Sequence, residues 1–265
     1  MHVVKVDEGR FLPTPDKPVF VLVMGHDARP GQTGPGRGDA LHVVGINPGA
    51  RAVTILNIPR DTWANIPGRG MDKINAGHYY GGPALQARVV SALVGVDISI
   101  VLTTSFEGLA DMVDELGGIN VDVPFPMNDR VSGAVFPAGT VRMDGGAALA
   151  FARNRNLAGG DFTRTHDHGI LMLAGLSKLR DSAPTATNTL KWMSVLARHT
   201  RFDGIGIGDL YRLGRLVLTI DPEEVRNVTM PGTTGSVGGQ SVVFAGASTP
   251  GLFADFRDDA ILQRN

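Results

Sequence analysis

The apolar residues of this chain occur in short runs that turn residues separate. Continuous apolar runs at residues 19–25 (VFVLVMG), 40–47 (ALHVVGIN) and 51–59 (RAVTILNIP) predict strands that are buried on both faces of a sheet. Only the tripeptide PGA separates the second run from the third, which favours a hairpin. Further strands are expected at 98–104, 119–124, 225–230 and 240–246, and a second hairpin at 133–143.

Other segments have apolar residues at helical spacing. Residues 81–95 predict a helix with Pro83 in its first turn, a position that accepts proline. Residues 105–118 predict an amphipathic helix that Ser105 caps and a Gly-Gly pair ends. Asp144 is placed to start a short helix. Longer helices are expected at 168–180, 187–199 and 207–220, and a last helix from Thr249-Pro250 onward.

Strands interspersed with helices predict one α/β domain. The expected architecture is a three-layer α/β/α sandwich around a central mixed sheet, because hairpins bring antiparallel pairs into the sheet. Small hairpins are expected at its periphery. The domain spans residues 1–265, without a linker or an internal repeat, and residues 185–265 complete the sheet and its helical cover.

Composition excludes several classes of function. A net charge of −1 with thinly spread basic residues argues against nucleic acid as a partner. The absence of cysteine excludes disulfides, thiolate zinc sites and a cysteine nucleophile. The sequence contains no apolar run of eighteen residues, and its N-terminus does not resemble a signal peptide.

Two aspartates bracket the long Gly/Pro-rich loop that follows the first strand. Asp27 and Asp39 stand at its two ends, so that their carboxylates can converge on a hard cation such as Mg²⁺ (or Mn²⁺), which prefers oxygen ligands. A structural interpretation stays open: Asp27 forms an Asx-turn and Asp39 caps the next element.

The third strand ends in NIPRDTW. Pro59 stops sheet pairing, and Arg60 and Asp61 follow it at the strand end. Taken alone, they fit an ordinary surface ion pair as well as a binding site. Residues 71–82 (MDKINAGHYYGG) come next and predict a lid or rim, with a solvated loop as the alternative.

The stretch FARNRNLAGGDFTR, residues 151–164, contains three arginines without any lysine or glutamate. A solvated helix face normally mixes those types, so this pattern indicates an anion site. Arg153 and Arg155 follow a short helix, and guanidinium groups suit the bidentate geometry of phosphate. Asp161 is expected to cap the next segment or to orient Arg164. Together with the earlier loops, the stretch predicts a clamp of metal and guanidinium groups for a pyrophosphate.

Seven motifs in order make the chain resemble the LytR-CpsA-Psr family. They are VLVMGHDAR, RGDALHVV, ILNIPRDTW, DKINAGHYYGGP, FEGLADMVDELGGINVDVP, MDGGAALAFARNR and GDFTR, and they cover about residues 18–180. The resemblance implies an α/β/α fold in which an apolar pocket between sheet and helices holds a polyprenyl tail, with the pyrophosphate at its mouth. The helices at 168–180 and 187–199 are candidates for its walls, and ordinary core packing stays open as the alternative explanation of their apolar residues.

The resemblance also assigns roles to residues. It implies metal ligands at Asp27 and Asp39, and Asp39 is a candidate for activating the acceptor hydroxyl. Three positions depart from the family pattern: Gly38-Asp39-Ala40 for Ser-Asp-Thr, Gly77-His78 for Ala-Tyr, and His168 where the family commonly has Gln. The implied catalytic and pyrophosphate-binding residues are Arg60, Asp39, Arg153, Arg155 and Arg164, with Asp161 and His168 among the substrate contacts.

The implied activity is a Mg²⁺-assisted transfer of a glycopolymer from a polyprenyl-pyrophosphate carrier to a sugar hydroxyl of peptidoglycan. The implied place is the extracytoplasmic face of a bacterial membrane, which the domain meets through its lipid substrate, with a native anchor lying outside this chain. Two alternatives stay open: hydrolysis of the lipid pyrophosphate, and a polyprenyl-phosphate binding module without catalysis.

Overall fold

The computed structural model describes residues 14, 17–27, 36–154, 156–182 and 185–263. A six-stranded sheet crosses the molecule in the order β11-β6-β1-β2-β3-β12. Its central strands are antiparallel, whereas β6 pairs with β1 and β12 with β3 in parallel, so the expected mixed sheet is confirmed. The strands are β1 Val19–His26, β2 Gly38–Asn47, β3 Ala52–Asn57, β6 Ile98–Ser105, β11 Thr200–Asp203 and β12 Arg226–Thr229.

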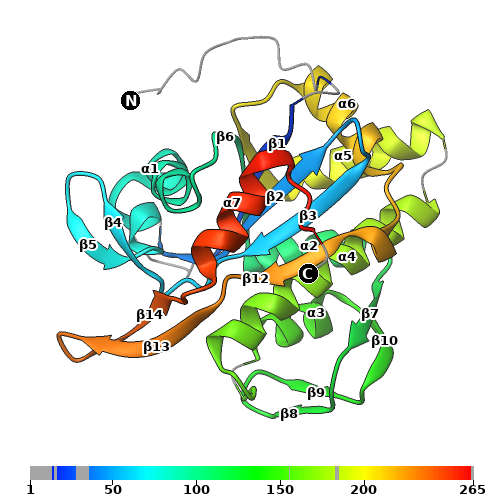
Figure 1. The fold of residues 1–265 in the computed structure, drawn as a ribbon. Helices are drawn as coiled ribbons and strands as arrows, with labels where there is room; N and C mark the ends of the chain where they lie inside the picture. The colour runs from blue at the N-terminus through cyan, green and yellow to red at the C-terminus, as the bar shows by residue number, and fades with distance from the viewer. Residues whose placement is uncertain (1–13, 15–16, 28–35, 155, 183–184, 264–265) are drawn as a thin grey trace.

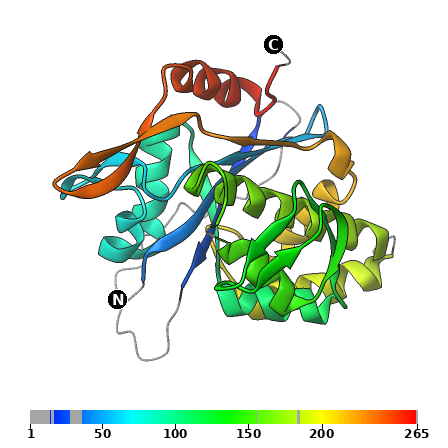
Figure 2. The same cartoon turned by 90° about the horizontal axis from the view of Figure 1, so that it is seen from below.

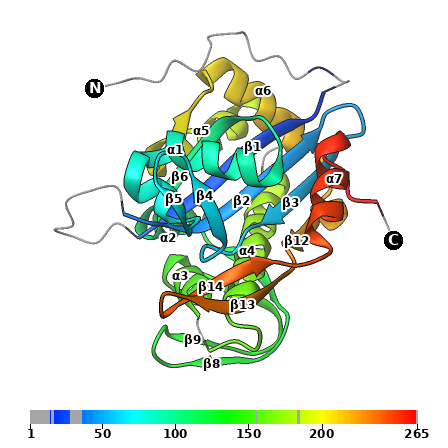
Figure 3. The ribbon, with the colours of Figure 1, turned by 60° about the vertical axis from the view of Figure 1, so that its left-hand side comes forward.

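Helices cover both faces of this sheet (Figures 1 and 3). On one face, α1 (Ala76–Val94) and α7 (Thr249–Asp259) pack on Leu22, Leu41 and other residues of the largest core cluster. On the other face, α4 (Asp161–Ser182) and α6 (Ile207–Val217) pack on Val21, Ile46 and their neighbours. The sheet residues alternate between these two cores, as the side-chain period of a strand requires. This arrangement is the predicted α/β/α sandwich.

Local signals fix several helix starts. The side chain of Ser105 accepts a hydrogen bond from the Gly108 N–H at the start of α2 (Phe106–Glu115), and Asp144 does the same for Ala147 in α3 (Gly145–Arg153). Three predicted starts are wrong. α1 begins at residue 76 with one turn that bends at residues 81–82, α4 begins at 161, and α5 (Ala186–His199) begins one residue early.

The residues that the structure describes also form four two-stranded sheets outside the central one. The hairpin predicted at 133–143 is wrong, because its two halves pair with different strands. β9 (Ala134–Phe136) pairs with β8 (Met127–Asp129), and β10 (Gly139–Met143) pairs with β7 (Ile119–Val123). The alternate residues of β7 are buried, so β10 completes a small core with it. The other two sheets join β4 (Trp63–Ile66) to β5 (Gly70–Lys73) and β13 (Gly232–Val237) to β14 (Gln240–Ala245).

The sheet brings three chain segments to one end. In the antiparallel register, His26 of β1 lies opposite Gly38 of β2, and His42 of β2 lies opposite Asn57 of β3. The end of β1, the start of β2 and the residues after β3 therefore meet at one edge. Figure 2 shows this edge between α1 on one side and the region of α3, β8 and β9 on the other. Within the described residues, no helix is long and apolar enough to cross a membrane.

Candidate functional site

Arg60 pairs with residues that are distant in the sequence. Its Nη1 binds the Asp39 carboxylate on the neighbouring strand, so the alternative interpretation as an Arg60–Asp61 ion pair does not hold. Asp61 instead binds Lys73, with Oδ1 and Nζ 3.1 Å apart. Burial alone would lower the pKa of Arg60, but the carboxylates of Asp39 and Asp161 outweigh burial and raise it. Arg60 therefore stays a cation at the sheet edge.

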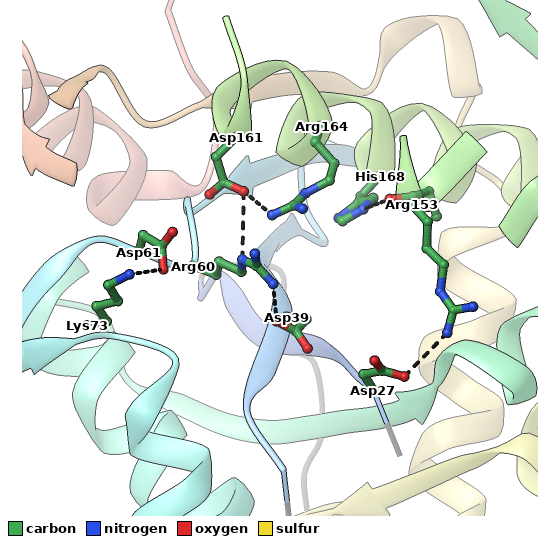
Figure 4. Close-up of polar contacts among 10 residues, drawn as sticks. Asp27, Asp39, Arg60, Asp61, Lys73, Arg153, Asp161, Arg164 and His168 are labelled. Atoms are coloured by element: carbon green, nitrogen blue, oxygen red, sulfur yellow. Dashed lines mark hydrogen bonds and ion pairs between the residues drawn. The ribbon is translucent and has the colours of Figure 1, made fainter. Parts of the chain in front are cut away.

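Asp161 connects this edge to the first turn of α4. Its Oδ1 binds the guanidinium group of Arg164 one helical turn later, and it lies 3.8 Å from Nε of Arg60 (Figure 4). One carboxylate oxygen therefore holds two guanidinium groups that come from different elements. This contact confirms the expected orienting role of Asp161 toward Arg164.

Arg153 completes the cationic side of the site from the end of α3. Its Nη2 lies 3.3 Å from Oδ1 of Asp27, and its guanidinium carbon lies 5.0 Å from the centre of the Phe106 ring. After it, Asn154 takes a non-helical conformation with ψ of 125°, so the chain turns away from the helix axis. The predicted partner Arg155 lies outside the described residues.

His168 ties α4 to the last turn of α3. Its Nε2 donates a hydrogen bond of 2.8 Å to the carbonyl oxygen of Ala152, which precedes Arg153. The ring also meets the edge of His42 at a centroid distance of 5.7 Å. Burial lowers the pKa of His168 to about 3 and that of His42 to about 4. Both rings are therefore neutral near pH 7 and cannot provide a positive charge to an anion.

These side chains surround one open cleft of about 1490 Å³. Its walls contain both guanidinium and carboxylate groups, and the turn between β8 and β9 forms part of one side. The lining includes Asp27, Arg37, Asp39, Arg60, Tyr79, Phe106, Glu107, residues 128–132, Ala152, Arg153, Asn156, Arg164 and His168.

A second, apolar cavity of about 370 Å³ lies between the sheet and the helices. Its walls come from β1, β2, β3 and β6 on one side and from α2, α4 and α5 on the other. Phe106, Ala152 and His168 line both this cavity and the cleft, so the two spaces meet at these residues. Leu171 and Leu176 of α4 and Val195 and Leu196 of α5 are among its lining residues, as predicted for these helices.

Part of the cleft was missed by the sequence analysis. Phe106 looked like an ordinary apolar residue of an amphipathic helix, and the turn at residues 128–132 lies between segments with weak patterns. The predicted lid at 71–82 is not a loop, because it comprises β5 and the first turn of α1. Its Tyr79 does reach the cleft, whereas His78 is buried.

Asp27 and Asp39 provide carboxylate oxygens, the type of donor that a magnesium ion prefers. They stand after the end of β1 and next to the start of β2, both line the cleft, and Figure 4 shows Asp27 beside Arg153 and Asp39 beside Arg60. Within the described part of the chain, no group of three or more acidic or imidazole side chains could hold a metal ion. Mg²⁺ commonly takes only one or two protein carboxylates and fills its shell with water and phosphate oxygens. The two carboxylates therefore suit that ion. To bind it, Asp39 would give up its ion pair with Arg60, and Asp27 its ion pair with Arg153.

The sequence is similar to proteins of bacterial cell-wall synthesis. It is 35% identical over 191 residues to the "Probable cell wall biosynthesis protein LcpB" of Corynebacterium glutamicum, covering 72% of this chain and 46% of that protein. It is 37% identical over 149 residues to the "Polyisoprenyl-teichoic acid--peptidoglycan teichoic acid transferase TagU" of Bacillus licheniformis, covering 56% of this chain and 47% of that protein. The chain thus spans about half the length of these curated relatives.

The fold is similar to solved structures. B. subtilis TagV superposes with a TM-score of 0.80 at 25% identity, over 94% of this chain and 99% of that one. The structure described as "TagT bound to LI-WTA" superposes with a TM-score of 0.77 at 23% identity, over 96% and 95% of the two chains. The sequence model of the LytR_cpsA_psr family matches residues 3–250. The chain therefore belongs to the LytR_cpsA_psr family.

Proposed function

We propose that this domain transfers a glycopolymer from a polyprenyl-pyrophosphate carrier to a sugar hydroxyl of peptidoglycan. The observation that carries the proposal is the junction of the apolar cavity with the charged cleft at Phe106, Ala152 and His168. A molecule with a long apolar tail and a diphosphate head matches both spaces at once. TagU, which is named as a transferase of this kind, supports the same assignment.

The guanidinium groups would bind the diphosphate. Arg60, Arg153 and Arg164 come from three segments of the chain and line the same cleft, where their guanidinium groups can form charge-assisted hydrogen bonds with phosphate oxygens. Catalysis of phosphoryl transfer relies mainly on positioning and on electrostatic stabilisation of the transition state. Ion pairs with Asp39, Asp161 and Asp27 fix these groups before the substrate arrives.

The reaction replaces the phosphoanhydride bond of the donor with a phosphodiester bond to the acceptor. The acceptor hydroxyl oxygen attacks the phosphorus next to the glycan, the bond from that phosphorus to the bridging oxygen breaks, and polyprenyl phosphate leaves. Asp39 is our candidate to take the hydroxyl proton, because its carboxylate lies in the cleft beside Arg60. Asp27 and Asp39 would hold a bound Mg²⁺. Such an ion neutralises charge on the diphosphate.

The partners follow from this reaction. They are a lipid-linked glycan as donor and peptidoglycan as acceptor, and the membrane surface is met through the lipid. The proposed place of action is the extracytoplasmic face of the cell membrane. That assignment agrees with the cell-wall role in the name of LcpB.

One experiment separates transfer from its alternatives. The purified domain is mixed with a short-chain prenyl diphosphate carrying a sugar, with Mg²⁺ and a soluble peptidoglycan glycan, and both products are followed by mass spectrometry. Transfer predicts a phosphodiester-linked glycan product that Arg60→Ala abolishes. Release of sugar phosphate without any linked product identifies a hydrolase. Tight donor binding without turnover would show a binding module and refute both catalytic functions.

A further inference from the structure

The first turn of α1 presents exposed aromatic residues at the rim of the cleft. Tyr79 is 54% exposed and lines the cleft, and Tyr80 beside it is 39% exposed. The hydroxyl of Tyr79 makes no hydrogen bond with another described residue. We propose that Tyr79 is the contact residue of a subsite for the acceptor glycan, in which its ring stacks on a pyranose of peptidoglycan. This inference rests on the proposed function and adds to it the place where the acceptor binds.

Hydrogen bonds attach this turn to the strand that carries Asp39. His78 Nδ1 lies 3.1 Å from the carbonyl oxygen of Gly36, and the N–H of Gly38 donates to the carbonyl oxygen of Asn75 over 3.3 Å. The N–H of His78 also donates to the side chain of Gln86, which fixes the turn on the body of α1. Tyr79 is therefore held at a set position relative to Asp39, the candidate acceptor of the hydroxyl proton.

Tyr80 acts as a positioning residue for its neighbour. Its hydroxyl donates to Oδ2 of Asp72 over 3.1 Å, and the guanidinium carbon of Arg69 lies 4.8 Å from its ring centre. The two tyrosine rings meet edge to face at a centroid distance of 5.4 Å. Both Asp72 and Arg69 belong to the hairpin of β4 and β5 or its turn. Asp72 and Arg69 therefore restrain the ring of Tyr80, and this ring packs against the more exposed ring of Tyr79.

The location of Tyr79 in the cleft suits contact with the acceptor glycan rather than with the lipid-linked donor. The apolar cavity meets the cleft at residues of α2, α3 and α4, whereas Tyr79 comes from α1 on the other flank of the sheet edge (Figure 2). In phosphoryl transfer the attacking and leaving oxygens lie roughly in line on opposite sides of the phosphorus. If the lipid phosphate leaves toward the cavity, the hydroxyl must arrive from the side of Asp39 and Tyr79.

The chemistry of the turn also suits a sugar. An aromatic ring binds the apolar C–H face of a pyranose, and the phenolic hydroxyl of Tyr79 can bind a sugar hydroxyl. Tyr has few rotatable bonds, so that ordering it costs little conformational entropy.

Direct titration of a peptidoglycan glycan tests the subsite without any need for turnover. A soluble β-1,4-linked tetrasaccharide is titrated by calorimetry into wild type, Tyr79→Ala, Tyr79→Phe and the control Met71→Ala, which alters an exposed apolar residue on nearby β5. We expect Tyr79→Ala to weaken binding about ten-fold, or ~1.4 kcal/mol. Tyr79→Phe keeps the stacking ring and should stay within about three-fold of wild type, as should Met71→Ala. Circular dichroism confirms that each variant is folded.

The outcomes separate this inference from the proposed function. Equal glycan affinity in wild type and Tyr79→Ala, no glycan binding by wild type, or an equal loss in Tyr79→Phe would each overturn the stacking subsite. Failure of the transfer reaction, with glycan binding that still depends on the ring of Tyr79, would instead refute the proposed function and leave the subsite in place.

Discussion

Nε2 of His168 lies 2.8 Å from the carbonyl oxygen of Ala152, and this hydrogen bond joins α4 to the last turn of α3. Because Arg153 follows directly, the bond also helps to set where that guanidinium group lies. The ring is neutral, so its role is to donate one hydrogen bond and to fill space between the cavity and the cleft. A glutamine, the residue common in the family, can do the same with its amide group.

We therefore expect His168→Gln to retain donor affinity and His168→Ala to reduce it. The alanine variant leaves a buried carbonyl without its partner, which should lower the free energy of unfolding by about 1–3 kcal/mol. It should also weaken binding of a prenyl diphosphate, because Arg153 is less well held. Calorimetric titration and thermal unfolding measure the two effects. Equal donor affinity in both variants would show that the hydrogen bond does not position Arg153.

Asp161→Asn should impair turnover more than binding. The substitution removes the negative charge that holds Arg164 and Arg60, and a small misplacement of catalytic groups costs about 10²-fold in rate. We expect kcat to fall by about 10–100-fold and donor affinity to fall by a smaller factor, because Arg60 and Arg164 also bind the diphosphate. The matched control is Asp209→Asn, which breaks an ion pair of the same i,i+3 spacing on α6, away from the cleft. Comparable kcat values for the two variants would contradict the prediction.

Gly175 offers a way to fill the apolar cavity. It lines that cavity, and an added Cβ would meet no atom within 4 Å. Gly175→Phe should weaken binding of a prenyl diphosphate at least about ten-fold, or ~1.4 kcal/mol, while inorganic pyrophosphate binds as before. Gly214→Phe on α6 is the control, since its Cβ is equally unobstructed but lies outside the cavity lining. A Gly175→Phe protein that still prefers the lipid would show that the tail binds elsewhere.

Gly175→Ala carries a separate expectation for stability. Alanine has the higher helix propensity, so the substitution within α4 should raise the free energy of unfolding by about 1 kcal/mol. Chemical denaturation measures it. No stabilisation would indicate that the added methyl group clashes after all.

Asp167 is fully buried, and neither of its carboxylate oxygens has a hydrogen-bond partner among the residues that the structure describes. Burial raises the pKa of Asp167 from 3.8 to about 7. The folded protein therefore holds a proton that the unfolded chain releases near pH 4, and this group lowers stability as pH rises from about 4 to about 7. Asp167→Asn should gain stability relative to wild type by on the order of 2 kcal/mol between pH 5 and pH 8. The exposed Asp122→Asn is the control, and parallel pH profiles for wild type and Asp167→Asn would refute the prediction.

His168 and His42 should make the protein less stable as the pH falls, which is opposite to the effect of Asp167. Their pKa values in the folded state, about 3 and about 4, lie below the ordinary 6.5. As the pH falls, these histidines bind protons in the unfolded chain before they do so in the folded protein. Their contribution to the free energy of unfolding is therefore complete above pH 6.5 and is lost as the pH falls toward 4. In His168→Gln the free energy of unfolding should fall less steeply with decreasing pH than in wild type, by up to ~1.4 kcal/mol per pH unit. Denaturation midpoints at pH 4.5, 5.5 and 6.5 measure the slopes, and identical slopes would contradict it.

Much of the fold could be predicted from local patterns. The buried strands at residues 19–25, 40–47 and 51–59 were visible because continuous apolar runs bounded by turn residues have few alternatives. Ser105 and Asp144 marked their helix starts through side-chain caps. The hairpin at 133–143 was predicted wrongly, because pairing is a long-range choice that β7 and β8 decide by burying their own apolar residues.

The sequence by itself determined the fold class, the family resemblance and which charged residues to suspect, since these depend on residue types and their order. Only the tertiary structure decided their partners. Arg60 binds Asp39 rather than its neighbour Asp61, because antiparallel pairing brings the start of β2 beside the end of β3. Tertiary packing likewise made His168 a buried neutral hydrogen-bond donor and placed Tyr79 at the rim. Burial and long-range contacts set these roles, and neither is encoded in local spacing.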